Sequence, residues 1–90
     1  MITVQRLLKS IEGIAKTLNW ESKPNPDPAI INYEGRGDGW VLLISKMEMG
    51  AGNDPFYGGA ISSPTRGLLV VIPADLAHKI FNIAQTQWVN

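Results

Sequence analysis

His78 is the only histidine in the chain, and no cysteine accompanies it. A histidine can serve as a general base or a metal ligand, but each role requires partner side chains. Asp75, three residues earlier, is the one nearby carboxylate, and no nucleophile and orienting group can be assigned beside it. We therefore expect a surface histidine, with no catalytic residue, no metal ligand and no cofactor.

The segment 35–39 reads Gly-Arg-Gly-Asp-Gly and is a second candidate for chemistry. It does not match a dinucleotide-binding fingerprint, because it does not lead from a strand into a helix, and the Lys-Ser/Thr end of a phosphate loop is missing. Arg36-Gly37-Asp38 resembles an integrin-binding triplet in its letters. Asp38-Gly39 is also typical of a tight hairpin turn, and the turn is the favoured interpretation.

The segment 50–59 is rich in Gly, Asn, Asp and Pro and carries two adjacent aromatic residues, Phe56 and Tyr57. Loops often carry function, and aromatic side chains are good contact residues at interfaces. The candidate partner-binding residues are therefore Asn53, Phe56, Tyr57 and Trp88. Two alternatives stay open: Phe56 folds over an open sheet face to complete the core, and Trp88 docks on the sheet.

Two segments have apolar residues at spacings of three and four, which predicts amphipathic helices over 3–18 and 74–88. Thr3 is available as an N-cap for the first helix, and Asp75 suits the first turn of the second. Alternating prolines in 20–28 predict an extended connector that follows the first helix.

Apolar and β-branched runs predict strands near 29–34, 40–47, 60–62 and 67–72. The expected fold class is α+β: an N-terminal helix, a three- to four-stranded antiparallel sheet and a C-terminal helix. Ninety residues suit one domain, so we expect a single domain over 1–90.

Residues 40–44 and 68–72 do not alternate between apolar and polar. An antiparallel strand with one wet face normally alternates, so we expect both sheet faces to be shielded from water. If both helices cover one face, the loop or another chain must cover the other, because monomers rarely expose so large an apolar patch. A homodimer or a docking surface is then expected. One helix on each face would instead leave a monomer.

Eight basic side chains balance eight acidic ones, without clusters. Nucleic-acid binders and polybasic membrane binders usually show a basic patch, so we expect neither kind of partner. No segment has the length of a transmembrane helix, and the first residues lack the pattern of a signal peptide. With no cysteine to form disulfides, the expected location is the cytoplasm.

The expected function is that of a small non-catalytic protein-binding domain: an adaptor, a chaperone-like factor or an inhibitor of another protein. A phage-encoded inhibitor would fit the small size. Binding would use an apolar sheet face or the 50–59 loop. The alternative is a small-molecule-binding protein or small enzyme with a pocket between the sheet and this loop. That alternative requires at least three of four side chains to converge on one cavity: Arg36, Arg66, Tyr57 and His78.

Overall fold

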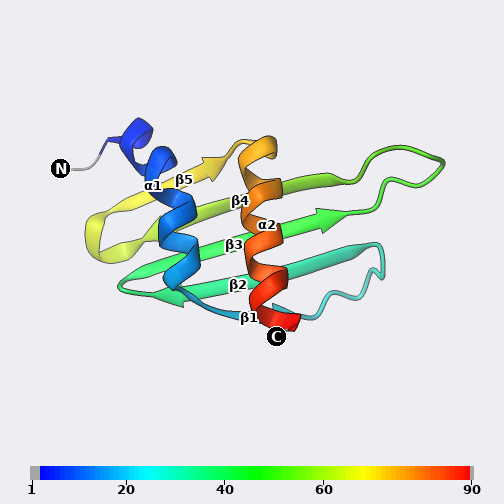
Figure 1. Cartoon of the computed structure of the whole chain (residues 1–90), viewed down its shortest axis with the longest axis horizontal. Coiled ribbons are helices and arrows are strands. Elements are labelled where there is room, and N and C mark those ends of the chain that lie inside the picture. Colours follow the sequence, from blue (N-terminus) through cyan, green and yellow to red (C-terminus); the bar gives the residue numbers. More distant parts are fainter. Residues whose placement is uncertain (1–2, 90) are drawn as a thin grey trace.

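The computed structural model describes residues 3–89, with side chains described through Gln87. The elements, in chain order, are α1 Val4–Thr17, β1 Asn19–Lys23, β2 Ile30–Gly37, β3 Trp40–Met47, β4 Phe56–Ser63, the 3-10 helix η1 Pro64–Arg66, β5 Leu68–Ile72 and α2 Ala74–Val89. The strands form one antiparallel sheet in the order β1-β2-β3-β4-β5. Both helices lie side by side on the same face of this sheet (Figure 1).

The predicted α+β order is confirmed, with five strands in place of the expected three to four. The additional strand, β1, occupies the first part of the segment that we predicted as a connector over 20–28. Trp20 explains the difference. Its ring packs so closely on Gly35 that a side chain there would overlap it, and its indole N–H donates to the Ala15 carbonyl at 2.8 Å. Pro24 lacks a backbone donor and follows the last residue of the strand.

Helix α1 begins as predicted, because the Thr3 side chain accepts a hydrogen bond from the Arg6 backbone N–H at 3.2 Å. It ends at Thr17, since Leu18 already has an extended backbone and leads directly into β1. One face of the helix is buried against the sheet and α2.

The tight turn predicted at Asp38-Gly39 joins β2 to β3, and both residues have positive φ, 51° and 79°. Two residues of this kind form the turn that suits a two-residue hairpin. The Arg66 guanidinium lies 4.5 Å from the centre of the Trp40 ring and donates to the Asp38 carbonyl at 3.0 Å. The integrin-like triplet is therefore divided between a strand and a tethered turn.

The largest fully buried apolar side chains form one core between the sheet and the helices: Leu7, Ile11, Leu42, Ile44, Ile61, Ile80 and Phe81. They come from both helices and from β3 and β4, the strands at the centre of the helix-covered face. Strand β4 starts at Phe56, four residues before the strand expected near 60–62, so the β3–β4 connection is shorter than the predicted loop.

The expectation that both sheet faces are shielded is wrong for this chain alone. Leu69 and Val71 are 75% and 77% exposed, whereas Ile72 on the opposite face is buried. Both helices occupy one face, so the arrangement with one helix on each face does not occur. The β3–β4 connection, residues 48–55, projects past the end of the sheet and does not fold over the bare face (Figure 1).

Candidate protein-binding surface

The sheet face without helices is the candidate site. Side chains of a strand alternate between the two faces, so the buried positions identify the outward ones. The outward residues of β3, β4 and β5 carry no charge, and we call this set the open apolar face. It consists of Val41, Leu43, Ser45, Met47, Phe56, Gly58, Ala60, Ser62, Leu69 and Val71.

The strand register places the centre of the open apolar face at Ala60. Leu43 on β3 and Val71 on β5 are its direct cross-strand neighbours, so the three side chains form one row. Leu43 is half exposed, and Val71 is exposed to a greater extent. The next row repeats the arrangement, with Ser62 between Val41 and Leu69. The larger apolar side chains of β3 and β5 therefore lie on either side of the small residues Ala60 and Ser62 of β4.

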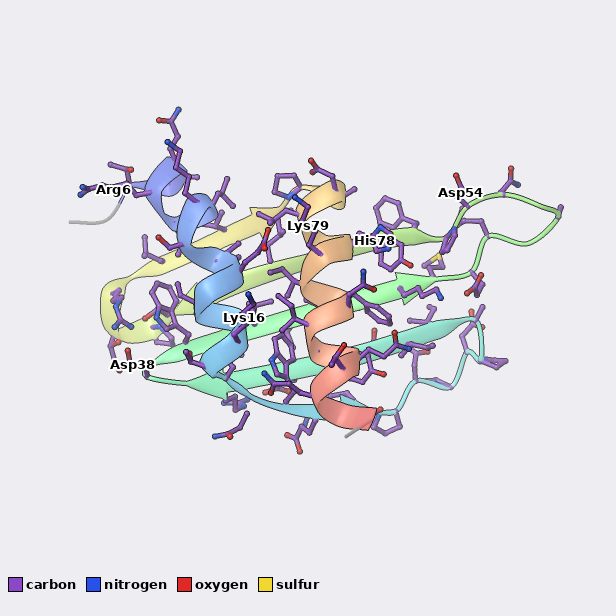
Figure 2. The ribbon with its side chains drawn as sticks, in the orientation of Figure 1. Arg6, Lys16, Asp38, Asp54, His78 and Lys79 are labelled. Atoms are coloured by element: carbon purple, nitrogen blue, oxygen red, sulfur yellow. The ribbon has the colours of Figure 1, made fainter. Side chains whose placement is uncertain are left out.

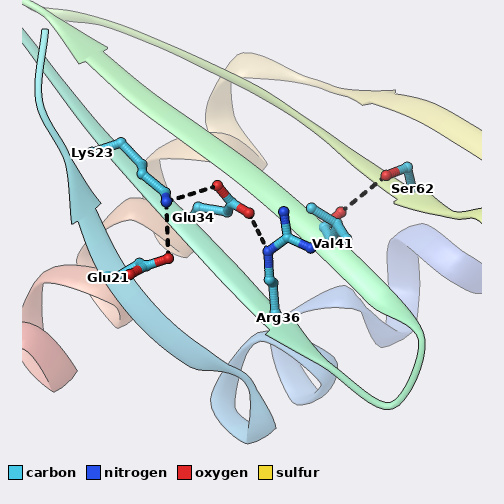
Figure 3. Close-up of polar contacts among 6 residues, drawn as sticks. All are labelled: Glu21, Lys23, Glu34, Arg36, Val41 and Ser62. Atoms are coloured by element: carbon cyan, nitrogen blue, oxygen red, sulfur yellow. Dashed lines mark hydrogen bonds and ion pairs between the residues drawn. The ribbon is translucent and has the colours of Figure 1, made fainter.

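The remaining part of this face, on β1 and β2, carries four charged side chains that we call the polar corner: Glu21, Lys23, Glu34 and Arg36 (Figure 3). The Lys23 Nζ lies 2.9 Å from Glu21 Oε1 and 3.5 Å from Glu34 Oε2, and Arg36 Nε contacts the other oxygen of Glu34. The hydrogen bond from Lys23 lowers the pKa of Glu21, and the same bond raises the pKa of Lys23. Two positive and two negative charges thus satisfy one another within the corner.

The adjacent aromatic residues Phe56 and Tyr57 point to opposite faces because they begin strand β4. Phe56 is 56% exposed and lies along the open apolar face over Gly58. Tyr57 faces α2, where its ring stacks on His78 with centroids 4.0 Å apart and meets the edge of Phe81 at 5.5 Å. The structure therefore brings Phe56 to the candidate surface and assigns Tyr57 to the helix-covered side.

The other two predicted contact residues do not extend this surface. Asn53 is exposed in the β3–β4 connection, and its backbone N–H donates to the Gly50 carbonyl at 3.0 Å. It belongs to the segment that projects beyond the sheet (Figure 1). The side chain of Trp88 lies outside the described residues.

Four exposed residues of the surface were not predicted from the sequence as contact residues: Leu43, Met47, Leu69 and Val71. The strands predicted at 40–47 and 67–72 contain all four residues, but each apolar run has residues on both faces. Period-two alternation divides such a run into two sets, and the sequence pattern does not reveal which set meets the helices.

The four side chains required for a small-molecule pocket do not converge. Arg36 belongs to the polar corner, and Arg66 covers Trp40 at the end of the sheet near η1. Tyr57 and His78 line a cleft of about 470 Å³ between the end of the β3–β4 connection and the start of α2, together with Asp54, Pro55, Phe56, Ala74 and Asp75. Figure 2 shows His78 on α2 and Asp54 on the connection at this side of the molecule.

Among the residues that the structure describes, no group of three His, Cys, Asp or Glu side chains could hold a metal ion. Over the same residues, no helix has both the length and the apolar character needed to cross a bilayer. Comparisons of the chain with protein-family models, curated proteins and solved structures found no match.

Proposed function

We propose that this chain is a non-catalytic protein-binding domain, of the adaptor or inhibitor kind, that docks through the open apolar face. The exposure of Leu69 and Val71 carries this proposal. They are adjacent outward positions of one strand, and each keeps three quarters of its surface in water. Contiguous exposed apolar surface rimmed by polar residues is characteristic of interaction sites.

The shape and chemistry of the surface favour a protein over a small ligand. Small ligands bind mainly in concave pockets, whereas most of this surface is the outer side of a sheet, with one hollow of about 290 Å³ where Leu43 lies near Lys23. Its apolar strands adjoin the self-paired polar corner, so the surface combines an uncharged apolar area with a polar margin on the β2 side, and protein interfaces likewise place polar residues around an apolar core. Phe56 adds an exposed aromatic ring at one end of the same face, a residue type suited to anchoring a partner.

The proposal can be tested with a photo-crosslinking amino acid placed at Val71, in the cells that produce the protein. Gln85, exposed on α2 in the helix layer, is the matched control position. We expect discrete covalent complexes with a protein from position 71 and none from position 85. Because Val71 is already exposed, the substitution should leave the fold intact, which circular dichroism can verify.

Two results would contradict the proposal. One is the absence of any protein adduct from position 71 while the variant is folded. The other is an identical set of adducts from positions 71 and 85, which would indicate unselective contact in place of a defined surface.

The four-residue pocket predicted from the sequence does not form, because only Tyr57 and His78 line a common cleft. A second candidate function is small-molecule binding in this Tyr57–His78 cleft. Its volume of about 470 Å³ supports this candidate because it lies within the range of ligand pockets. The carboxylates of Asp54 and Asp75 beside the stacked rings favour a planar cation. Titration with benzamidine, followed by NMR, should shift Tyr57 and His78 signals in the wild type and less in Asp75→Asn. Equal shifts in both proteins, or none, would count against this candidate.

A further inference from the structure

We infer that the partner seated on the open apolar face is a second copy of this chain, in an isologous homodimer whose sheets stack face to face. The inference rests on the proposed function, because it takes this face to be a protein-binding surface and names the occupant. Three observations support a second copy: the charge of the face, its size and the position of Ala60.

The charges on this side of the sheet favour self-association. The open apolar face carries no charged side chain, so stacking two copies buries no unpaired charge there. The polar corner has two charges of each sign that are already paired within one chain. The whole chain has a formal net charge of zero, so two copies approach without long-range repulsion. A strongly charged partner would find no complementary charge on the apolar strands.

The whole helix-free side of the sheet, made of the open apolar face and the polar corner, approaches the size of a dimer contact. Five strands spaced about 4.8 Å apart, with up to about eight residues of about 3.3 Å each, span a footprint of roughly 500–600 Å². Because side chains roughen this area, its accessible surface approaches the roughly 800 Å² per partner of a standard interface. The apolar strands β3, β4 and β5 make up one side of this surface and the polar corner on β1 and β2 the other, so the contact would be apolar around Ala60 and polar toward β1.

Ala60 identifies the centre of the contact. An isologous interface places the same patch of two copies together, so the middle of the patch lies against itself. Ala60 stands between Leu43 and Val71 in the central row, and this holds whichever direction the two-fold axis takes in the plane between the sheets. Within one chain nothing described covers this row, because the β3–β4 connection projects away from it (Figure 1).

Sedimentation velocity over a concentration series provides the first test. We expect wild type to show a reversible monomer–dimer equilibrium and the double variant Leu69→Lys/Val71→Lys to raise the dimer dissociation constant at least about 30-fold. The charge-matched control Gln5→Lys/Gln85→Lys adds the same two charges at exposed helix positions and should dimerise like wild type. Both changes in the double variant lie at exposed positions, so its melting curve should remain cooperative.

Site-directed crosslinking provides the second test, and the absence of native cysteine makes it specific. A single Ala60→Cys substitution should give a covalent dimer with a short bis-maleimide reagent, since facing sheets pack about 10 Å apart. Gln85→Cys is the control and should stay monomeric with the same reagent. Mixing Ala60→Cys with excess Leu69→Lys/Val71→Lys protein should not reduce the yield, because that variant cannot join the interface.

The outcomes separate this inference from the proposed function. A strictly monomeric wild type without linkage at position 60 overturns the inference, and adducts of position 71 with a different protein would then still support the proposed function. A dimer that links at position 85, or that links at neither cysteine, also overturns it. Linkage at position 85 would indicate that the copies touch through their helices. Linkage at neither position would indicate that they pair along the edge of β5, because that arrangement leaves the two Ala60 residues too far apart for the reagent to join.

Discussion

Phe56 and Tyr57 show how one residue step in a strand separates two similar side chains. Both are large aromatic residues at the start of β4, and the sequence groups them as one candidate anchor. Tyr57 stacks on His78 and meets Phe81, so it holds α2 against the sheet. Phe56 faces the other way and leaves more than half of its surface in water.

We predict that Tyr57→Ala and Phe56→Ala have different effects on folding. Removing Tyr57 deletes partly buried aromatic contacts and should lower the free energy of unfolding by about 2–3 kcal/mol. Removing Phe56 should change it by less than about 1 kcal/mol, because little of the ring is buried. Urea denaturation at a protein concentration that keeps the chain monomeric measures both values. Equal destabilisation by the two changes would show that Phe56 belongs to the core.

The polar corner makes the titration of Glu21 depend mainly on Lys23, with a smaller effect of Arg36 in the same direction. The hydrogen bond and the charge of Lys23 lower the pKa of the Glu21 carboxyl, and Glu21 raises the pKa of Lys23. The lowered carboxyl pKa means that the pair favours folding at neutral pH and loses this effect as the pH falls through that pKa. The raised lysine pKa means that the effect is also lost in strong alkali. Both groups are exposed, so the contribution to stability is small.

We predict that Lys23→Met returns the pKa of Glu21 upward toward its ordinary value. The substitution removes both the donor and the positive charge while keeping a side chain of similar length. An NMR titration of the side-chain carboxyl signals measures the change. Lys9→Met, which alters an exposed lysine on α1, should leave the Glu21 titration unchanged. An unchanged pKa in Lys23→Met would show that the ion pair does not form in solution.

At the scale of elements, two glycines illustrate opposite requirements of strand and helix. Gly59 of β4 lies so close to β3 that a Cβ there would overlap the Leu43 carbonyl oxygen and approach the Ile44 Cδ1 to 2.6 Å. Gly13 of α1 is exposed, with nothing within 4 Å of the position of a Cβ. Close packing therefore requires glycine at position 59, whereas at position 13 glycine only weakens the helix.

We predict that Gly59→Ala destabilises the protein by about 2–3 kcal/mol or more, because the new methyl group must displace the backbone of β3 or the Ile44 side chain. Gly13→Ala should stabilise it by about 0.5–1 kcal/mol, since alanine has a higher helix propensity and meets no neighbour. Thermal and urea denaturation of the two variants supply the comparison. A neutral Gly59→Ala would mean that β3 and β4 are further apart than described.

The two edge strands of the sheet differ in how well they are protected from pairing with another chain. Edge strand β1 carries the charged residues Glu21 and Lys23 and is followed by Pro24, features that discourage pairing with another chain. Edge strand β5 consists of five apolar residues without such protection. Pairing along β5 is therefore the main alternative to face-to-face stacking, and the crosslinking test at Ala60 distinguishes the two.

At the scale of the whole molecule, the sheet is covered on one side only. Strand β3 lies at its centre and pairs with β2 and β4, and its inward side chains Leu42 and Ile44 are fully buried. Strands β1 and β5 each pair on one side only. The backbone amides at the centre of the sheet are therefore better protected from exchange with solvent than those of the two edge strands.

Amide hydrogen exchange should reproduce this order. We predict that the amides of Leu42 and Ile44 exchange most slowly, by opening of the whole fold, and that those of the exposed residues Ala51 and Gly52 exchange at least about 100-fold faster. The amides of β1 and β5 should fall between these limits. Greater protection of β1 than of β3 would contradict the strand order.

Much of the fold was predictable because its signals are local. The Thr3 cap, the helical spacing of both helices and the Asp38-Gly39 turn each depend on residues within a few positions of one another, and the structure contains all three. Strand β1 was not predictable in this way. It exists because Trp20 packs on Gly35 and bonds to α1, a contact between three separate segments.

The amino-acid sequence by itself determined the class of the fold and the order of the helices and middle strands. It also determined that the sheet has apolar side chains on both faces, more than two helices on one face can cover. The tertiary structure alone decided which side the helices cover. Leu68 and Leu69 are chemically identical neighbours, yet one packs half-buried against the core and the other is three quarters exposed. The physical reason is that alternation assigns side chains to two faces, while contacts with distant helices select the buried face.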